Sequence, residues 1–284
     1  MDTITNEEVT NSFNVMDHRD MIHERLATCS SDSFVCVWDR EENGTWVKTA
    51  GWKVHGGPIW RVVWAHPQFG QVLATCSNDR SVFIWEESYE ENGVCRWSKK
   101  AYLADSRTSV TDIKFACPQL GLILAASSAQ GVLRVYEAAD SILSLKLTIS
   151  RPVNNVAFSP AVAAVGHQVA IAAGDIVMYN VNVKKKYEVG GESPDPTQYQ
   201  AHKVAVLADL SKVWRLSWNV TGNSLTASSE DGTLRVWKSI FYDEWRLVSS
   251  TSPLQSDEKK KESKGAMLSV PNPLPSQLPN MAYY

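Results

Sequence analysis

The feature that most constrains the fold is an internal repeat of one short sequence phrase. Each copy starts with a run of small residues, passes through a polar turn and an alternating stretch, and ends in an aromatic residue. The five closing aromatic residues are Trp38, Trp85, Tyr136, Tyr179 and Trp237. They recur at intervals of roughly 40 to 60 residues, which is typical of an architecture that stacks one supersecondary unit with loop insertions of variable length. The chain therefore predicts five copies of one unit.

A second phrase precedes four of these copies. It alternates apolar and other residues with a period of two, which predicts a β-strand, and it ends at a turn signal. The four stretches are residues 59–64, 110–115, 153–158 and 213–218. Together the two phrases predict a four-stranded antiparallel blade repeated around an axis, as in a WD-repeat β-propeller. The second phrase would form the innermost strand, the small residues the second strand, the segment ending in the aromatic residue the third, and sequence such as 95–103 the outer strand.

Polar residues recur along with the blades. Three aspartates fall in the predicted turn between the second and third strands, where Asp tolerates a left-handed backbone and bonds the local backbone. A buried polar network stabilises a blade when each member is satisfied. Because parts of the set recur from copy to copy, we interpret it as structural and not catalytic. The predicted network consists of Asp32 and Trp38 in the first copy, His55, Thr75 or Ser77, Asp79 and Trp85 in the second, and Asp231 and Trp237 in the last.

Charge and composition argue against several classes of protein. The net charge is −3, so no strong field favours direct contact with nucleic acid. No apolar stretch approaches the roughly 20 residues of a membrane span, and the polar, acidic N-terminus does not resemble a secretory signal, so we expect no membrane insertion. The five cysteines are odd in number and lack C-x-x-C spacing, which predicts a reducing compartment, nuclear or cytosolic.

Catalytic and metal chemistry find little support in the sequence. Asp112 is the only carboxylate within the four inner-strand stretches, so the acidic pair of a propeller hydrolase is missing. The six histidines have no partner at the i+2 or i+4 position, a spacing that would favour metal binding. We therefore predict no enzyme activity, no cofactor and no metal.

Longer motifs resemble a particular family. Residues 60–74 resemble two sister scaffold propellers, one of the nuclear pore and one of the vesicle coat. Residues 105–115 and 213–222 are similar to the Seh-type nucleoporins of the Y-shaped outer-ring subcomplex, and the likeness extends from about Asp17 to Trp245. The resemblance implies an open six-bladed propeller. It also implies a larger helical nucleoporin as partner, which inserts β-strands beside the first blade by β-augmentation and covers an exposed sheet edge.

The same resemblance implies where such a chain works. It predicts a non-catalytic scaffold at the nuclear envelope, within the nuclear pore complex, which contacts other outer-ring nucleoporins and supports transport of protein and mRNA. It also implies membership of a nutrient-sensing complex upstream of the TOR kinase at the lysosomal or vacuolar surface, and a kinetochore location. Partner binding is assigned to apolar residues around the first blade, namely Phe13, Val15, Ile22, Phe34, Val35 and Val37.

The sequence departs from this family pattern in two places. Only two residues separate His23 from the small-residue run that starts at Leu26, too few for an inner strand and a turn, so we expect an incomplete first blade. Five copies are present where the family has six. The missing copy is expected after Ala138, near residues 139–143, with an outer-type strand resuming at 145–149. We expect the shortened chain to fold less stably or to bind its partner weakly.

The chain is expected to divide into three parts. These are an N-terminal segment with a partial first strand (1–25), the propeller (26–247) and a disordered tail (248–284) rich in Ser, Lys and Pro. Glycines and prolines within residues 182–202 predict a loop between two strands.

Two other functions remain open. The resemblance to the sister family leaves a vesicle-coat scaffold as one alternative. The other is a peptide-reading adaptor of another complex, which would grip a short motif with an arginine-lined surface. Arg61, Arg107, Arg151 and Arg215 are the candidates for that surface. Because Arg61 and Arg215 fall within inner strands, we expect them to bond neighbouring blades instead.

Overall fold

The computed structural model of the chain is all β. It describes residues 10–18, 21–89, 95–138, 143–149, 151–160, 167–184, 198–208, 211–241 and 244–252. Within these ranges twenty strands form five antiparallel sheets of four strands each. None of the described helices is long and apolar enough to cross a membrane.

Every sheet is built from four strands that are consecutive in the chain. The first contains β1 (Thr10–His18), β2 (Met21–Cys29), β3 (Phe34–Arg40) and β4 (Trp46–Lys53). The second contains β5 (Ile59–Trp64), β6 (Val72–Ser77), β7 (Val82–Tyr89) and β8 (Cys95–Leu103). The third contains β9 (Val110–Phe115), β10 (Ile123–Ser128), β11 (Val132–Glu137) and β12 (Leu143–Thr148). The fourth contains β13 (Asn155–Phe158), β14 (His167–Ala173), β15 (Asp175–Lys184) and β16 (Gln198–Leu207). The fifth contains β17 (Val213–Trp218), β18 (Ser224–Ser229), β19 (Leu234–Phe241) and β20 (Glu244–Thr251).

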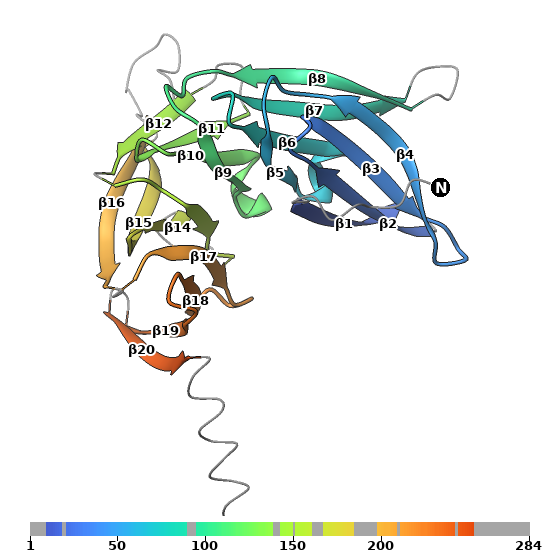
Figure 1. Cartoon of the computed structure of the whole chain (residues 1–284). Helices are drawn as coiled ribbons and strands as arrows, with labels where there is room; N and C mark the ends of the chain where they lie inside the picture. The colour runs from blue at the N-terminus through green and yellow to red at the C-terminus, as the bar shows by residue number, and fades with distance from the viewer. Residues whose placement is uncertain are drawn as a thin grey trace, which may run out of the picture.

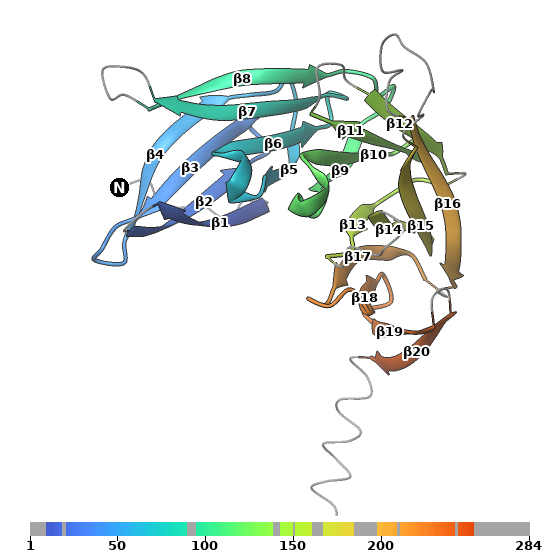
Figure 2. The ribbon, with the colours of Figure 1, turned by 180° about the vertical axis from the view of Figure 1, so that it is seen from behind.

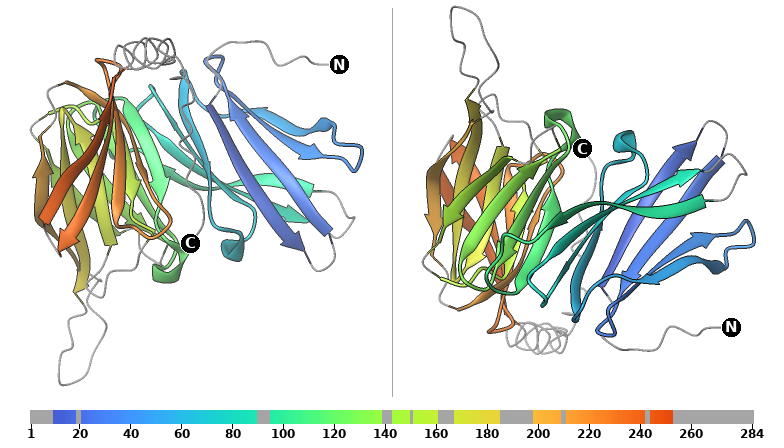
Figure 3. Two further views of the ribbon diagram at one scale, coloured as in Figure 1. Left: turned by 90° about the horizontal axis from the view of Figure 1, so that it is seen from below. Right: turned by 90° about the horizontal axis from the view of Figure 1, so that it is seen from above.

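The sheets stand around an arc with the first strand of each on the inside (Figures 1 and 2). Inner strands pack in order, β1 on β5, β5 on β9, β9 on β13 and β13 on β17, and no comparable contact joins β17 to β1 in the described ranges. The first sheet, in blue, and the last, in orange, form the two ends of the arc (Figure 3). Among the described strands, none from one end of the chain enters a sheet at the other end, so no described strand closes the ring. The predicted open propeller with five blades is confirmed.

The expectation of an incomplete first blade is wrong. Residues Thr10–His18, which carry none of the inner-strand phrase, form β1 and pair with β2 in an unbroken register from Thr10↔Cys29 to His18↔Met21. Main-chain hydrogen bonds need no particular side-chain pattern, so the alternation rule did not reveal this strand. The first sheet thereby begins well before the predicted propeller boundary at residue 26.

The other strand predictions need smaller corrections. The outer strand expected at 145–149 is confirmed as β12, which begins two residues earlier and ends one residue earlier. The loop expected over 182–202 is wrong at both ends, because β15 continues to Lys184 and β16 begins at Gln198, so His202 lies on an outer strand. Residues 139–142, where the missing repeat was placed, lie outside the described part of the chain. So does most of the predicted tail, from residue 253 onward.

Four apolar clusters fill the wedges between neighbouring sheets. Small side chains on the second strands make this close packing possible, and Ala27, Ala74, Ala125, Ala170 and Ala227 are all fully buried. In β6 and β10 each of the six residues is buried, since these sheets are covered on both faces. In β18 burial alternates between buried and half-buried residues. The last sheet is therefore covered on one face only.

The turns between the second and third strands of three sheets share one hydrogen-bond pattern. Asp32, Asp79 and Asp231 each accept a hydrogen bond from the backbone N–H two residues later. The left-handed residue is the one directly after the aspartate, Ser33 or Arg80 in the first two blades. The prediction that these aspartates bond the local backbone in the turn is confirmed, and the left-handed position itself falls on the next residue.

Candidate protein-binding surface

A buried histidine organises the second sheet. His55 Nδ1 lies 2.9 Å from Asp79 Oδ2 and 3.0 Å from Ser81 Oγ, while His55 Nε2 lies 2.9 Å from Thr75 Oγ1. The backbone N–H of Gly56 also donates to Asp79 Oδ2. This geometry suits a neutral imidazole that donates from Nδ1 and accepts the Thr75 hydroxyl proton at Nε2.

Burial and hydrogen bonding set the charges in this network. Burial lowers the pKa of His55, with Asp79 opposing the effect. Burial alone would raise the pKa of Asp79, but the donors Ser81 and Gly56, together with His55, hold this pKa below its ordinary value. The pair is thus a neutral imidazole beside a carboxylate, held by several hydrogen bonds.

The remaining predicted members of the network differ in whether, and with which group, they form a hydrogen bond. In the first sheet Trp38 Nε1 donates to Thr28 Oγ1 at 3.1 Å, a link that the sequence did not reveal. In the second sheet Ser77 turns away from His55 and donates to the carbonyl of Pro58. The indole nitrogens of Trp85 and Trp237 are buried without a hydrogen-bond partner in the described part of the chain.

Around the axis, a relay of polar side chains joins four inner strands. Arg61 Nε donates to Asp112 Oδ1 at 2.8 Å, and Asn155 Nδ2 donates to Asp112 Oδ2 at 2.7 Å. Asn155 Oδ1 then accepts the backbone N–H of Leu216 at 2.8 Å. The relay therefore ties the second, third, fourth and fifth sheets together. The prediction that Arg61 bonds a neighbouring blade is confirmed, but Arg215 has no such bond among the described residues.

A second relay runs beside the first, one residue earlier in each inner strand. Trp60 Nε1 donates to Ser109 Oγ at 3.1 Å. Thr111 Oγ1 donates to the carbonyl of Val153 at 2.7 Å, and Asn154 Nδ2 donates to the carbonyl of Val213 at 2.9 Å. Each blade thus binds the start of the next inner strand. Sequence spacing alone could not reveal the bonds of Thr111 and Asn154, because their acceptors are backbone atoms of another repeat.

These polar groups are arranged for structure. Both carboxylate oxygens of the fully buried Asp112 are occupied, one by Arg61 and the other by Asn155 and the N–H of Val156. No group of three His, Cys, Asp or Glu side chains in the described part of the chain could hold a metal ion.

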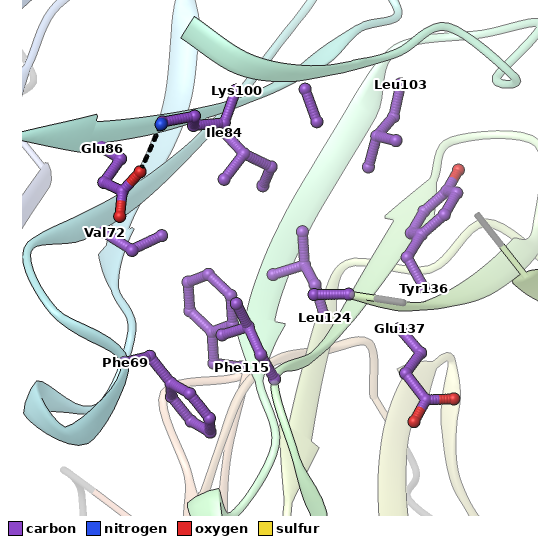
Figure 4. Close-up of a pocket in the computed structure, with 13 residues that line it drawn as sticks. Phe69, Val72, Ile84, Glu86, Lys100, Leu103, Phe115, Leu124, Tyr136 and Glu137 are labelled. Carbon is purple, nitrogen blue, oxygen red and sulfur yellow. Dashed lines mark ion pairs between the residues drawn. The ribbon is translucent and has the colours of Figure 1, made fainter. Parts of the chain in front are cut away.

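A cavity of about 500 Å³ opens between the second and third sheets (Figure 4). Its wall is mostly apolar, with Phe69, Phe115 and Leu124 among the lining residues. The ion pair between Lys100 Nζ and Glu86 Oε2, 2.6 Å apart, lies on one side of it. Such a site suits burial of an apolar side chain. No sequence pattern indicated it, because its residues come from two repeats.

The first sheet divides the predicted partner-binding residues between its two faces. Val35 and Val37 are fully buried, because they pack against Ile59 and Val62 of the second sheet. Their assignment to partner binding is therefore wrong; β-strand alternation turns them away from their neighbour Phe34, which is 40% exposed. The first sheet thus offers a partner only the face opposite its valines.

The three other predicted residues lie on β1 and β2. Phe13 pairs in register with Leu26 and Val15 with Glu24, while Ile22 pairs with Asp17. Leu26 pairs in turn with Trp38 on β3. The side chains of Phe13, Val15 and Ile22 lie outside the described part of the chain, so only their register is assigned.

The last sheet has the other uncovered face. Leu234 is 50% exposed, and Thr226 and Ser228 are half-buried although they lie on a central strand. Trp214, on the inner strand, is 44% exposed, with Lys212 Nζ 3.9 Å from the centre of its ring. Leu234, Thr226 and Ser228 thus lie on the face of the last sheet that its neighbour, the fourth sheet, does not cover.

Open sheets with these turns and wedges define a WD-repeat β-propeller, and the model of the family "WD domain, G-beta repeat" matches residues 46–86 and 198–238. Nucleoporin SEH1-A of Xenopus laevis is 37% identical over 309 residues, with 82% of this chain and 85% of that protein covered. Nucleoporin SEH1 of Homo sapiens and its counterpart in Bos taurus are each 35% identical over 329 residues, with 87% of this chain and 91% of the relative covered. The chain belongs to the SEH1 family of nucleoporins.

This result confirms the resemblance inferred from the motifs. An alignment of 309 positions is longer than the whole chain of 284 residues, so the relatives contain segments that have no counterpart here. A missing repeat is consistent with that difference.

Proposed function

We propose that the chain is a non-catalytic scaffold subunit of the outer ring of the nuclear pore complex, where it binds a helical nucleoporin that adds β-strands to the open arc. The observation that carries the proposal is the arc itself. The first and last sheets each leave one face uncovered, and no strand of the described chain closes the gap. Membership of the SEH1 nucleoporins supports the location.

Strand addition has a physical cause here. Uncovered sheet faces and unpaired edges expose apolar surface and backbone groups that favour association with another chain. A partner that inserts strands between the two ends would cover the face bearing Phe34 on one side and the face bearing Leu234 on the other. Other outer-ring nucleoporins would then be reached through the helical partner.

The wider roles follow from this placement. As a pore subunit the chain would support transport of protein and mRNA across the nuclear envelope. The TOR-linked nutrient-sensing complex at the lysosomal or vacuolar surface, and the kinetochore, are proposed as further sites at which the same surface is used.

The peptide-reading alternative is less well supported by the arginines. Arg61 is bound to Asp112, and Arg151 NH1 lies 3.5 Å from Asp175, so two of the four predicted residues have acidic neighbours within the chain. Such an adaptor would keep its arginines free for a ligand. A vesicle-coat scaffold would use the same open arc and differs only in the partner recovered.

The test is a pull-down of the tagged full chain from nuclear envelope extract, followed by reconstitution with the helical nucleoporin that it recovers. Phe34→Asp should weaken the complex about tenfold or more, since it places a charge in the covered face. Val206→Asp is the matched control, because Val206 is 46% exposed on the outer strand β16, away from both ends. Recovery of coat subunits in place of outer-ring nucleoporins, or equal binding by both variants, would refute the proposal.

A further inference from the structure

The two relays around the axis have a direction. In the second relay each side chain donates forward along the chain, to the start of the next inner strand, and in the first relay Arg61 donates forward to Asp112 in the same way as Trp60 does to Ser109. Trp214 and Arg215 occupy these two positions on β17, the last inner strand. The pair Trp–Arg thus occurs twice, once with its receiving strand and once at the end of the arc.

The second pair has no receiver. Within the described ranges the structure shows no hydrogen bond or ion pair for the Arg215 guanidinium, and no acceptor for the Trp214 indole N–H, although both residues are exposed. By contrast, in the second relay Trp60, Thr111 and Asn154 each donate to the start of the next inner strand. The group missing for Trp214 and Arg215 is therefore the next inner strand, the one that would follow β17.

The charges around Arg215 also indicate that a partner group is missing. Although solvent reaches Arg215, the surrounding chain partly desolvates it; this desolvation and the nearby Arg61 lower the pKa of Arg215, and Asp112 only partly offsets them. Lys114, which solvent also reaches, lies in the same surroundings, since partial desolvation and the two arginines lower its pKa as well. Asp112 already serves Arg61 and Asn155. Three cations thus face one carboxylate near the axis, and a second carboxylate would complete the arrangement.

We propose that the partner strand that follows β17 carries a hydroxyl residue and, three positions later, a carboxylate, which receive Trp214 and Arg215 as Ser109 and Asp112 receive Trp60 and Arg61. This inference rests on the proposed function and gives its partner a chemistry. The occupant is a β-strand of another protein with a Ser/Thr-x-x-Asp/Glu sequence. The chain's own β1 is already packed on β5 at the opposite end of the arc.

The test measures the affinity of the full chain for the recombinant helical nucleoporin recovered above. Arg215→Ala should weaken binding about 30-fold or more, through a faster off-rate, because it leaves the partner carboxylate buried and unpaired. Lys203→Ala removes the same charge from the exposed outer strand β16 and should change the affinity less than about twofold. The melting temperature of the free chain should stay unchanged in both, since Arg215 has no partner to lose.

A charge exchange identifies the receiving residue. Arg215→Asp should abolish binding, and replacing the Asp or Glu of the partner's Ser/Thr-x-x-Asp/Glu sequence with Arg should restore it. If Phe34→Asp weakens binding while Arg215→Ala does not, strand addition stands and this inference falls. The inference would also be overturned if no charge-reversed partner restored binding to Arg215→Asp. It would likewise be overturned if the free chain associated with itself and Arg215→Ala abolished that association.

Discussion

Single polar residues decide how firmly neighbouring sheets are joined. Asp112 is fully buried and receives donors from the second and fourth sheets. A buried carboxylate of this kind is costly to desolvate, so its value depends on all of its partners being present. Asn155 extends the same arrangement to the fifth sheet without charge.

Replacing Asp112 by Ala should lower the free energy of unfolding by about 3 kcal/mol, because it leaves Arg61 partly buried without its carboxylate. The double variant Arg61→Met/Asp112→Leu should lose less than the single variant, since neither charge is then left unpaired. Urea unfolding at pH 7 would measure both. A cost under about 1 kcal/mol for Asp112→Ala would show that the relay does not join the sheets.

His55 should make stability depend on pH. Its pKa in the folded chain is lowered from 6.5, so below that pH the unfolded chain binds a proton that the folded chain binds only at lower pH. The free energy of unfolding therefore falls as the pH drops below about 6.5. The lowered pKa of Asp79 adds a second loss, in a separate window below about 3.8.

Urea unfolding between pH 7 and 5 checks this expectation. His55→Gln should flatten the dependence in that window, whereas His202→Gln, on the exposed part of β16, should keep the slope of the original chain. An unchanged slope in His55→Gln would assign the effect to other groups.

At the scale of elements, each blade depends on one tight turn and one run of small residues. Gly131 occupies the left-handed position of the third blade with φ +80°, where a Cβ atom would meet the carbonyl oxygen of Ile149 at 2.1 Å. Both the conformation and the space therefore require glycine. Gly70 has nearly the same φ, +82°, but nothing lies within 4 Å of the corresponding Cβ position.

This pair separates steric overlap from backbone strain. Gly70→Ala should cost about 2 kcal/mol, from backbone strain alone, because its φ of +82° and ψ of −165° lie in a region that is almost restricted to glycine. Gly131→Ala should cost clearly more, since the backbone of the chain after β12 must also move. Thermal and urea unfolding of the two variants would measure the difference, and equal losses would mean that the outer strand yields without cost.

The elements also show what the sequence could reveal. Alternation and small residues located the second, third and most inner strands, because burial on both faces leaves a readable pattern. The strand β1 escaped because residues 10–18 pair through the backbone and lack that pattern. Val35 and Val37 were assigned to the wrong face because their apolar character does not say which side of the sheet the partner covers. The relay bonds of Thr111 and Asn154 escaped because carbonyl acceptors leave no mark in the sequence.

For the whole molecule, the decisive property is that the three central sheets are covered on both faces while the two end sheets are covered on one. Local opening is easier where fewer buried contacts must be broken. The middle strand β18 of the last sheet shows this in its alternating burial, whereas β6 and β10 are buried throughout.

Hydrogen exchange should follow this arrangement. Amides of β18 should exchange faster than those of β6 and β10, although all three are central strands with neighbours on both sides. Addition of the helical nucleoporin should slow exchange in β17 to β19 and leave β10 unchanged. Uniform protection along the free chain would contradict the one-sided packing of the last sheet.

The absence of a latch bears on how many blades such a chain can carry. In a sealed ring the angles between blades must add up to a full turn, and one strand must travel back to join both ends, so the number of units is fixed by geometry. In an open arc of blades, the angles between neighbouring blades need not add up to a full turn. Such an arc can bury each blade against its neighbour whatever the number of blades, which gives a physical reason why an arc of five blades can fold.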